Sequence, residues 1–119
     1  MARNTAYTLT QDNGQQTPAN AVGKVVYPAT AIVAADYSQF DVGFKPSYVQ
    51  FVNATDRVTV EWYQGLAADN CIKTAATGAR TLETANGGIT VTDSGFRVSQ
   101  NATLAAILAS KECYFVARA

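Results

Sequence analysis

Apolar and polar residues alternate most regularly between positions 47 and 63, where the chain has the sequence SYVQFVNATDRVTVEWY. Successive side chains of a β-strand point to opposite faces, so a period of two predicts two strands, each with one buried face. The apolar residues of those faces are Val49, Phe51, Val58, Val60 and Trp62. The polar residues 53–56 suit a turn, because short Asn, Asp and Thr side chains satisfy neighbouring backbone groups. The segment therefore predicts a β-hairpin that supplies the largest ring of the core.

Shorter runs of the same kind predict further strands at 22–27, 71–74, 80–84, 89–92, 96–98 and 113–117. The sequence NGG at 86–88 predicts that two of them form a hairpin, because Asn and Gly tolerate the positive φ angles of a tight turn. Leu82, Ile89 and Val91 are expected to face inward. The Ala-rich residues 29–36 fit either a strand or one helical turn.

The two ends of the chain have patterns of their own. One short helix is predicted over 102–109, where apolar residues recur at spacings of three and four. Residues 1–21 are polar and interrupted by Asn-Gly and Pro, which predicts an extended arm. The arm is either a disordered terminus or a segment that orders on a neighbouring protein. The expected fold is all-β: a small β-sandwich or jelly-roll-like single domain at 22–119, with an extended N-terminal arm and one short helix near the C-terminus.

The amino-acid composition limits both the fold class and the kind of binding partner to be expected. Thr is abundant whereas Leu, Lys and Glu are scarce, which favours pleated sheets over solvent-facing helices. A length of 119 residues suits one domain. Nine basic residues balance nine acidic ones, so the chain lacks the field that attracts nucleic acid or an anionic membrane. No apolar run has the length of a signal peptide or approaches the roughly 20 residues of a membrane span. We therefore expect synthesis in the cytosol, no nucleic-acid partner and no membrane.

The residue types needed for common catalytic and metal sites are largely missing. The chain contains no histidine, which excludes Ser-His, Cys-His and His-zinc sites. Cys71 and Cys113 are too far apart in sequence for a metal knuckle and too few for a disulfide framework. In a reducing cytosol they are expected as buried thiols, with a disulfide left open for a protein that ends outside a cell. We expect no metal and no cofactor.

Acidic residues are the remaining candidates for chemistry, because a glycosidase needs only a pair of carboxylates. The aspartates fall in turn-rich segments, where their ordinary role is in loops and caps. Glu61 lies instead in the middle of a predicted strand, and a cross-strand ion pair with Arg57 is favoured over a catalytic role. The sequence predicts that the protein is not an enzyme.

Tyrosine is the most frequent aromatic residue, with six in the chain, and it tolerates a half-buried interface well. Tyr48 and Tyr63 fall on the face of the main hairpin opposite Trp62. That face is either covered by a second sheet, which is the favoured interpretation, or open to a protein or a sugar. Tyr48 and Tyr63, together with Tyr7 and Leu9 of the arm, are the candidate partner-binding residues.

Five segments of the body have a further significance when taken together. They are FKPSYVQFVNATDR at 44–57, EWYQG at 61–65, TGARTL at 77–82, ITV at 89–91 and GF at 95–96. In combination they resemble a family of small virion proteins encoded among the head genes of tailed bacteriophages. The resemblance covers roughly residues 42–119, and residues 1–40 take no part in it.

The resemblance implies a capsid decoration, or cement, protein. Such proteins are compact β-sandwich or jelly-roll domains that sit on the outside of the icosahedral shell and bridge subunits of the major capsid protein. The implied partner is the major capsid protein, the implied location is the exterior of the virion, and a homo-oligomer on the capsid is expected. A polar arm that orders on binding is suited to spreading contacts over several subunits.

Two alternatives of other classes remain. A tail- or fibre-associated carbohydrate-binding or adhesion module would use Trp62 and exposed tyrosines as stacking platforms, but the position of Trp62 on an apolar face weighs against it. A small hydrolase would use Glu61 with a nearby aspartate, and requires two carboxylates about 5 to 10 Å apart in a cleft.

Overall fold

The computed structural model describes residue 3 and residues 7–13, 20–29, 36–68, 70–84, 88–99 and 108–119. These residues form ten β-strands and no helix. The strands are β1 (Thr8–Asn13), β2 (Asn20–Val26), β3 (Tyr37–Asp41), β4 (Tyr48–Asn53), β5 (Val58–Tyr63), β6 (Cys71–Thr74), β7 (Arg80–Glu83), β8 (Ile89–Val91), β9 (Gly95–Ser99) and β10 (Glu112–Arg118). The prediction of an all-β fold is confirmed.

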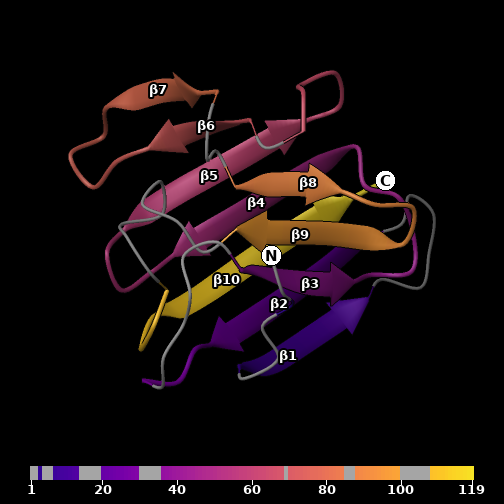
Figure 1. Cartoon of the computed structure of the whole chain (residues 1–119), viewed down its shortest axis with the longest axis horizontal. Coiled ribbons are helices and arrows are strands. Elements are labelled where there is room, and N and C mark those ends of the chain that lie inside the picture. Colours follow the sequence, from indigo (N-terminus) through magenta and orange to yellow (C-terminus); the bar gives the residue numbers. More distant parts are fainter. Residues whose placement is uncertain are drawn as a thin grey trace.

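The strands form two antiparallel sheets. The large sheet has the order β1-β2-β10-β4-β5-β6-β7, and the small sheet has the order β3-β9-β8. The small sheet lies over the middle of the large one, in front of β2, β10 and β4, whereas β6 and β7 extend beyond it (Figure 1). This arrangement is sandwich-like, as expected, with the core between the two layers.

Aromatic rings from both sheets form the centre of the core. The Phe40 ring of the small sheet lies with its centroid 5.1 Å from that of Phe115 and 5.9 Å from that of Phe51, both in the large sheet. Phe96 packs against Phe40 at 5.2 Å and against Phe115 at 5.2 Å. All four rings are buried. Because each buried ring contributes roughly 1.5–3 kcal/mol by leaving water, this cluster holds the layers together.

Two glycines allow the layers and strands to approach this closely. A Cβ atom on Gly23 would overlap the ring of Phe115, which therefore packs directly on the backbone of β2. A Cβ atom on Gly95 would overlap the carbonyl oxygen of Phe40 in the neighbouring strand β3. Both positions require glycine for space, since neither has a positive φ angle.

The main hairpin has the predicted form. Strands β4 and β5 pair antiparallel with Asn53 opposite Val58, which leaves a turn of residues 54–57. In this turn the side-chain amide of the buried Asn53 donates to Asp56 at 2.9 Å, and the backbone N–H of Asp56 donates to Asn53 Oδ1 at 3.1 Å. Trp62 lies on the inner face and is 8% exposed. The prediction of a buried tryptophan is confirmed.

The hairpin predicted around residues 86–88 is wrong. Strand β7 pairs with β6 in the large sheet, whereas β8 pairs with β9 in the small sheet. The chain therefore crosses between the layers at this point instead of reversing within one. Leu82 lies opposite Ile72 in the register and is 58% exposed, so its predicted inward position is also wrong.

The ends of the chain are only partly described. Of the helix predicted over 102–109, residues 102–107 lie outside the described part, and the two that are described, the buried Leu108 and Ala109, lie in no helix. Residues 30–35, expected as a strand or a helical turn, are also outside it. Within the predicted arm, Thr8–Asn13 forms the edge strand β1 on β2. This part of the arm is therefore paired with the body of its own chain.

Both cysteines are buried, and neither forms a disulfide. Cys71 lies in β6 and Cys113 in β10, and β4 and β5 separate these strands. Three strand spacings of about 4.8 Å each put the two residues about 14 Å apart. Because a disulfide needs Cα atoms within about 7 Å, the fold forbids a bond between them. Burial raises the pKa of the Cys113 thiol to about 12.

An ion pair ties the turn of the main hairpin to the segment before β10. The ammonium group of Lys111 lies 3.0 Å from Asp56 Oδ2 and donates to Oδ1 at 3.2 Å. This contact lowers the pKa of Asp56, and the amide of Asn53 acts in the same direction. The folded state therefore favours the ionised carboxylate, and the pair stabilises the fold only where Asp56 is charged.

We expect Lys111→Met to lower the free energy of unfolding by about 0.5–1 kcal/mol near neutral pH. Because the folded pKa of Asp56 is depressed, the contribution is present above the unfolded-state pKa and is lost as pH falls through the folded one. Urea unfolding at about pH 7 and about pH 2 should show the two proteins converging in acid. Lys24→Met, which removes a more exposed pair with Glu112, is the control and should change stability less. A deficit that persists in acid would contradict the assignment to Asp56.

Candidate functional site

The face of the large sheet that turns away from the small sheet carries an unusual set of exposed apolar side chains. Val22 is 52% exposed and Val26 is 41% exposed on β2, and Tyr114 of β10 is 38% exposed. The pairing of β10 with β2 and the alternation along both strands place all three on the same face. We call Val22, Val26 and Tyr114, with Lys24 and Glu112 between them, the outer patch.

The charges of the outer patch are organised around Tyr114. Its hydroxyl donates a hydrogen bond to Glu112, and the Lys24 ammonium lies 5.8 Å from the centre of its ring. Lys24 and Glu112 form an exposed ion pair at 3.7 Å. The hydrogen bond from Tyr114 lowers the pKa of Glu112 and raises that of the phenol. The patch therefore presents apolar surface and a tyrosine, a residue enriched at protein interfaces, beside a balanced pair of charges of the kind found at a polar rim.

Tyr48 and Tyr63 lie together on the same outer face. They pair across β4 and β5 with ring centroids 5.2 Å apart, and both hydroxyls donate to Glu61 Oε2, at 2.9 Å and 3.2 Å. Arg80 of β7 donates to the other oxygen, Oε1, at 3.1 Å. Burial, followed by the contact with Glu61, raises the pKa of Tyr48 to about 12. Both carboxylate oxygens of Glu61 are thus used in binding the sheet together.

This network corrects the expected role of Arg57. The cation that pairs with Glu61 is Arg80, two strands away across β6, and Arg57 sits in the hairpin turn with a φ of 60°. The expectation of a structural ion pair at Glu61 was right in kind but named the wrong partner. Arg80 reaches this carboxylate only because β6 pairs with β5 and β7 pairs with β6. The spacing of residues along the sequence does not reveal this pairing.

Tyr7 and Leu9 lie away from the two outer tyrosines. The Tyr7 hydroxyl donates to the backbone oxygen of Gln39 at 2.9 Å, and its ring lies 5.5 Å from that of Phe40 and 5.6 Å from that of Tyr27. Leu9 pairs with Val25, whose side chain is on the inner face, and is 38% exposed at the sheet edge. The four candidate partner-binding residues therefore divide between two faces and do not form one surface.

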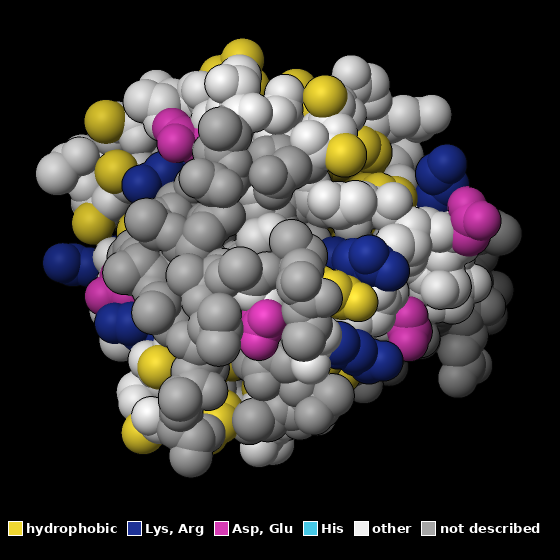
Figure 2. Space-filling model, viewed as in Figure 1, with side chains coloured by type: hydrophobic (Ala, Val, Ile, Leu, Met, Phe, Trp, Pro, Cys, Tyr) yellow, Lys and Arg dark blue, Asp and Glu magenta, His cyan; other side chains and the backbone are white. Residues whose placement is uncertain are grey.

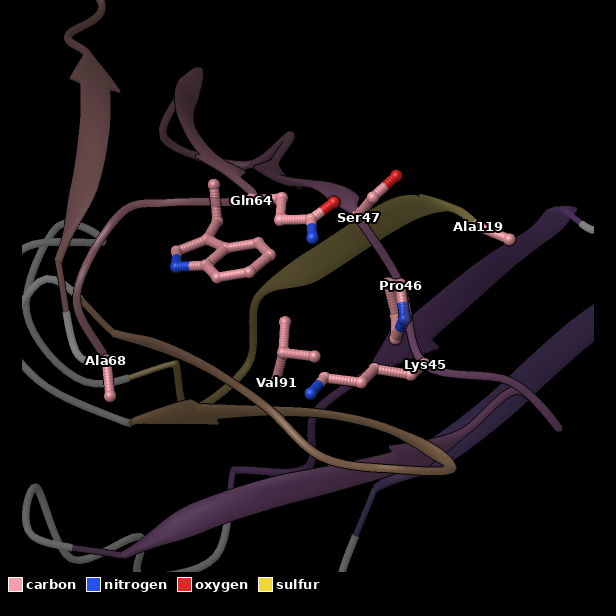
Figure 3. Close-up of a pocket in the computed structure, with 8 residues that line it drawn as sticks. Lys45, Pro46, Ser47, Gln64, Ala68, Val91 and Ala119 are labelled. Carbon is pink, nitrogen blue, oxygen red and sulfur yellow. The ribbon is translucent and has the colours of Figure 1, made fainter.

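A pocket of about 440 Å³ opens at the end of the sandwich where β4 begins and β5 ends. It is lined by Lys45, Pro46, Ser47, Trp62, Gln64, Ala68, Val91 and Ala119, which come from both sheets and from the connecting segments (Figure 3). Nothing in the sequence pattern indicated a pocket at Lys45 or Gln64, and Trp62 was expected as a core residue.

Other kinds of site find little support in the described residues. There is no group of three or more His, Cys, Asp or Glu side chains placed to hold a metal ion in this part of the chain. The same residues include no helix of a length and hydropathy suited to crossing a membrane. On the side of the small sheet, the Lys and Arg side chains of the described residues are interspersed with those of Asp and Glu (Figure 2).

Comparison with family models, with curated proteins and with solved structures finds no match for this chain.

Proposed function

We propose that the protein is a structural component of a tailed-phage virion that binds the outer surface of the capsid and stabilises it by bridging subunits of the major capsid protein. The observation that carries the proposal is the outer patch, an exposed group of two valines and a tyrosine beside a balanced ion pair. The resemblance of residues 42–119 to small phage head proteins supplies the identity of the partner.

The physical properties of the fold suit this role. Two packed sheets with a cluster of buried aromatic rings form a rigid body, and Glu61 is committed to Tyr48, Tyr63 and Arg80. A protein that binds only the assembled lattice stabilises that lattice by mass action and needs no catalytic group. We therefore assign it a binding role without enzymatic activity, as a homo-oligomer on the virion exterior.

A tail- or fibre-associated carbohydrate-binding module is the alternative. It requires an exposed aromatic platform, and Trp62 is only 8% exposed. The paired rings of Tyr48 and Tyr63 are half-buried and already bonded to Glu61. These observations favour the capsid role over the glycan role.

The test is binding of the full chain to capsids of the same phage that were assembled without it. We expect saturable co-sedimentation and a raised capsid melting temperature. Val26→Glu should weaken binding at least about tenfold, because it buries a charge in the interface. Since Val26 is 41% exposed, the variant should keep the melting temperature of the free protein within a few degrees.

Leu82→Glu is the matched control, because Leu82 is equally apolar and 58% exposed on the same face but lies in β7, five strands from β2. At about 4.8 Å per strand it is roughly 19 Å from β10, the nearer strand of the outer patch, and roughly 24 Å from β2. Capsid binding by this variant should equal that of the unaltered protein. Failure of the unaltered protein to bind would overturn the capsid role, and equal weakening by both variants would remove the outer patch as its site.

A further inference from the structure

The pocket at the β4–β5 end is separate from the outer patch. Trp62 is on the inner face of the large sheet, whereas the outer patch is on its other face. Val91, at the end of β8, contributes a wall from the small sheet. The pocket therefore lies between the layers, and its volume of about 440 Å³ falls in the range of small-molecule sites.

The polar groups of the pocket are biased toward hydrogen-bond donors. Among the eight described residues that line it, Lys45 is the one with a charged side chain, and none has an acidic side chain. Figure 3 shows the Lys45 side chain extending along the pocket toward Val91, with the carboxamide of Gln64 turned toward the same space. The lining residues thus offer an ammonium group and an amide N–H to a shared volume.

Trp62 contributes to the pocket in a different way. Its Nε1 atom is buried and has no hydrogen-bond partner in the described structure, although the residue lines the pocket. Because this atom has almost no accessible surface, a ligand in the pocket does not reach it, and the indole supplies a buried wall of the pocket rather than a hydrogen-bond donor.

We propose that this pocket binds a carboxylate carried on a small apolar group. A carboxylate only accepts hydrogen bonds, so it matches the Lys45 ammonium group and the Gln64 amide N–H, and a charged acceptor strengthens each bond. Pro46, Val91 and Ala68 supply apolar wall for the attached group. A neutral sugar fits less well, because the burial of Trp62 leaves little ring face for stacking.

The single tryptophan makes the proposal directly testable. Its indole N–H gives one cross-peak in a proton–nitrogen correlation spectrum of the labelled full chain. Titration with phenylacetate should shift this peak saturably, and phenylacetamide, which has the same shape without the charge, should bind at least about tenfold more weakly. A peak that does not move with phenylacetate would show that the pocket does not bind the acid, and an equal response to the amide would show that the charge is not recognised. Either result would overturn the proposal.

Variants test the role of the cation. Lys45→Met should weaken phenylacetate binding about tenfold, and Gln64→Leu should weaken it less, because a neutral donor is lost. Arg57→Met removes an exposed cation from the turn at the other end of the β4–β5 hairpin and should leave binding unchanged. Lys45 and Gln64 are exposed, so both pocket variants should fold, which thermal unfolding checks. Equal binding by Lys45→Met would overturn the assignment.

A second titration identifies the source of the carboxylate. A capped pentapeptide with one central glutamate between leucines is compared with its glutamine counterpart in the same titration. Stronger binding by the glutamate peptide than by phenylacetate assigns the pocket to an acidic side chain of a protein partner. Binding of phenylacetate alone assigns it to a free small acid, and binding of neither overturns the proposal.

Discussion

Truncation of Phe40 to alanine is expected to lower the free energy of unfolding by about 3–5 kcal/mol. Phe40 is fully buried, and its ring contacts those of Tyr7, Phe51, Phe96 and Phe115 at centroid distances between 5.1 and 5.9 Å. It is the ring through which the small sheet meets the large one. The loss of buried apolar surface and the cavity left behind both contribute to this cost. The total is a large share of the roughly 5–15 kcal/mol that stabilises a domain.

Urea unfolding followed by the fluorescence of Trp62 measures this loss. Leu82→Ala is the control, because Leu82 is 58% exposed on β7 and its truncation should change stability by only about 0.5 kcal/mol. A loss below about 1 kcal/mol for Phe40→Ala would mean that the neighbouring rings close the cavity, and would contradict a rigid core.

Gly95→Ala is expected to cost about 3 kcal/mol or more although it adds a single methyl group. The new Cβ would overlap the carbonyl oxygen of Phe40 and lie 3.0 Å from the Cα of Asp41. These are backbone atoms of β3, which pairs with β9 in the small sheet, so they move only if the pairing of Asp41 with Gly95 opens. Overpacking usually costs about 1–3 kcal/mol, and a collision with backbone falls at the upper end.

The matched control for this effect is Gly78→Ala. A Cβ on Gly78 would meet nothing within 4 Å, but the residue has a φ of 92°, which disfavours an L-side chain. Its cost should therefore be about 1–2 kcal/mol, from backbone conformation alone. Thermal unfolding separates the two, with the larger fall in Tm for Gly95→Ala. Equal falls in Tm would show that strands β3 and β9 can move apart at little cost in free energy.

Local alternation was sufficient to predict the elements whose partner is the next strand along the chain. Strands β4 and β5 have one apolar face each and a turn sequence between them, so pairing, register and the burial of Trp62 all follow from one segment. The strand β10 was predicted from its own alternation, although its partners β2 and β4 lie far away in the sequence. Strands β1 and β3 were not predicted, because polar residues dominate the first and the second is interrupted by Ser38 and Gln39.

The features that the sequence could not predict depend on contacts between segments that are distant in the chain. The chain between β7 and β8 has the sequence of a tight turn, yet the two strands join different sheets, and turn chemistry contains no information on which layer the next strand enters. The same limit applies to Glu61, whose cation arrives with β7, and to the pocket, whose walls come from four separate segments. Tyr48 and Tyr63 were correctly placed on one face, because they belong to a single hairpin.

The position of β10 in the large sheet has a consequence for the order of folding. Residues 112–118 lie between β2 and β4, which are not neighbours without them. During synthesis both of these strands therefore leave the ribosome with open hydrogen-bonding edges that only β10 can close. The chain cannot complete its large sheet until residues 112–118 have been made, so the nascent chain needs protection from edge-to-edge pairing with other copies until β10 arrives.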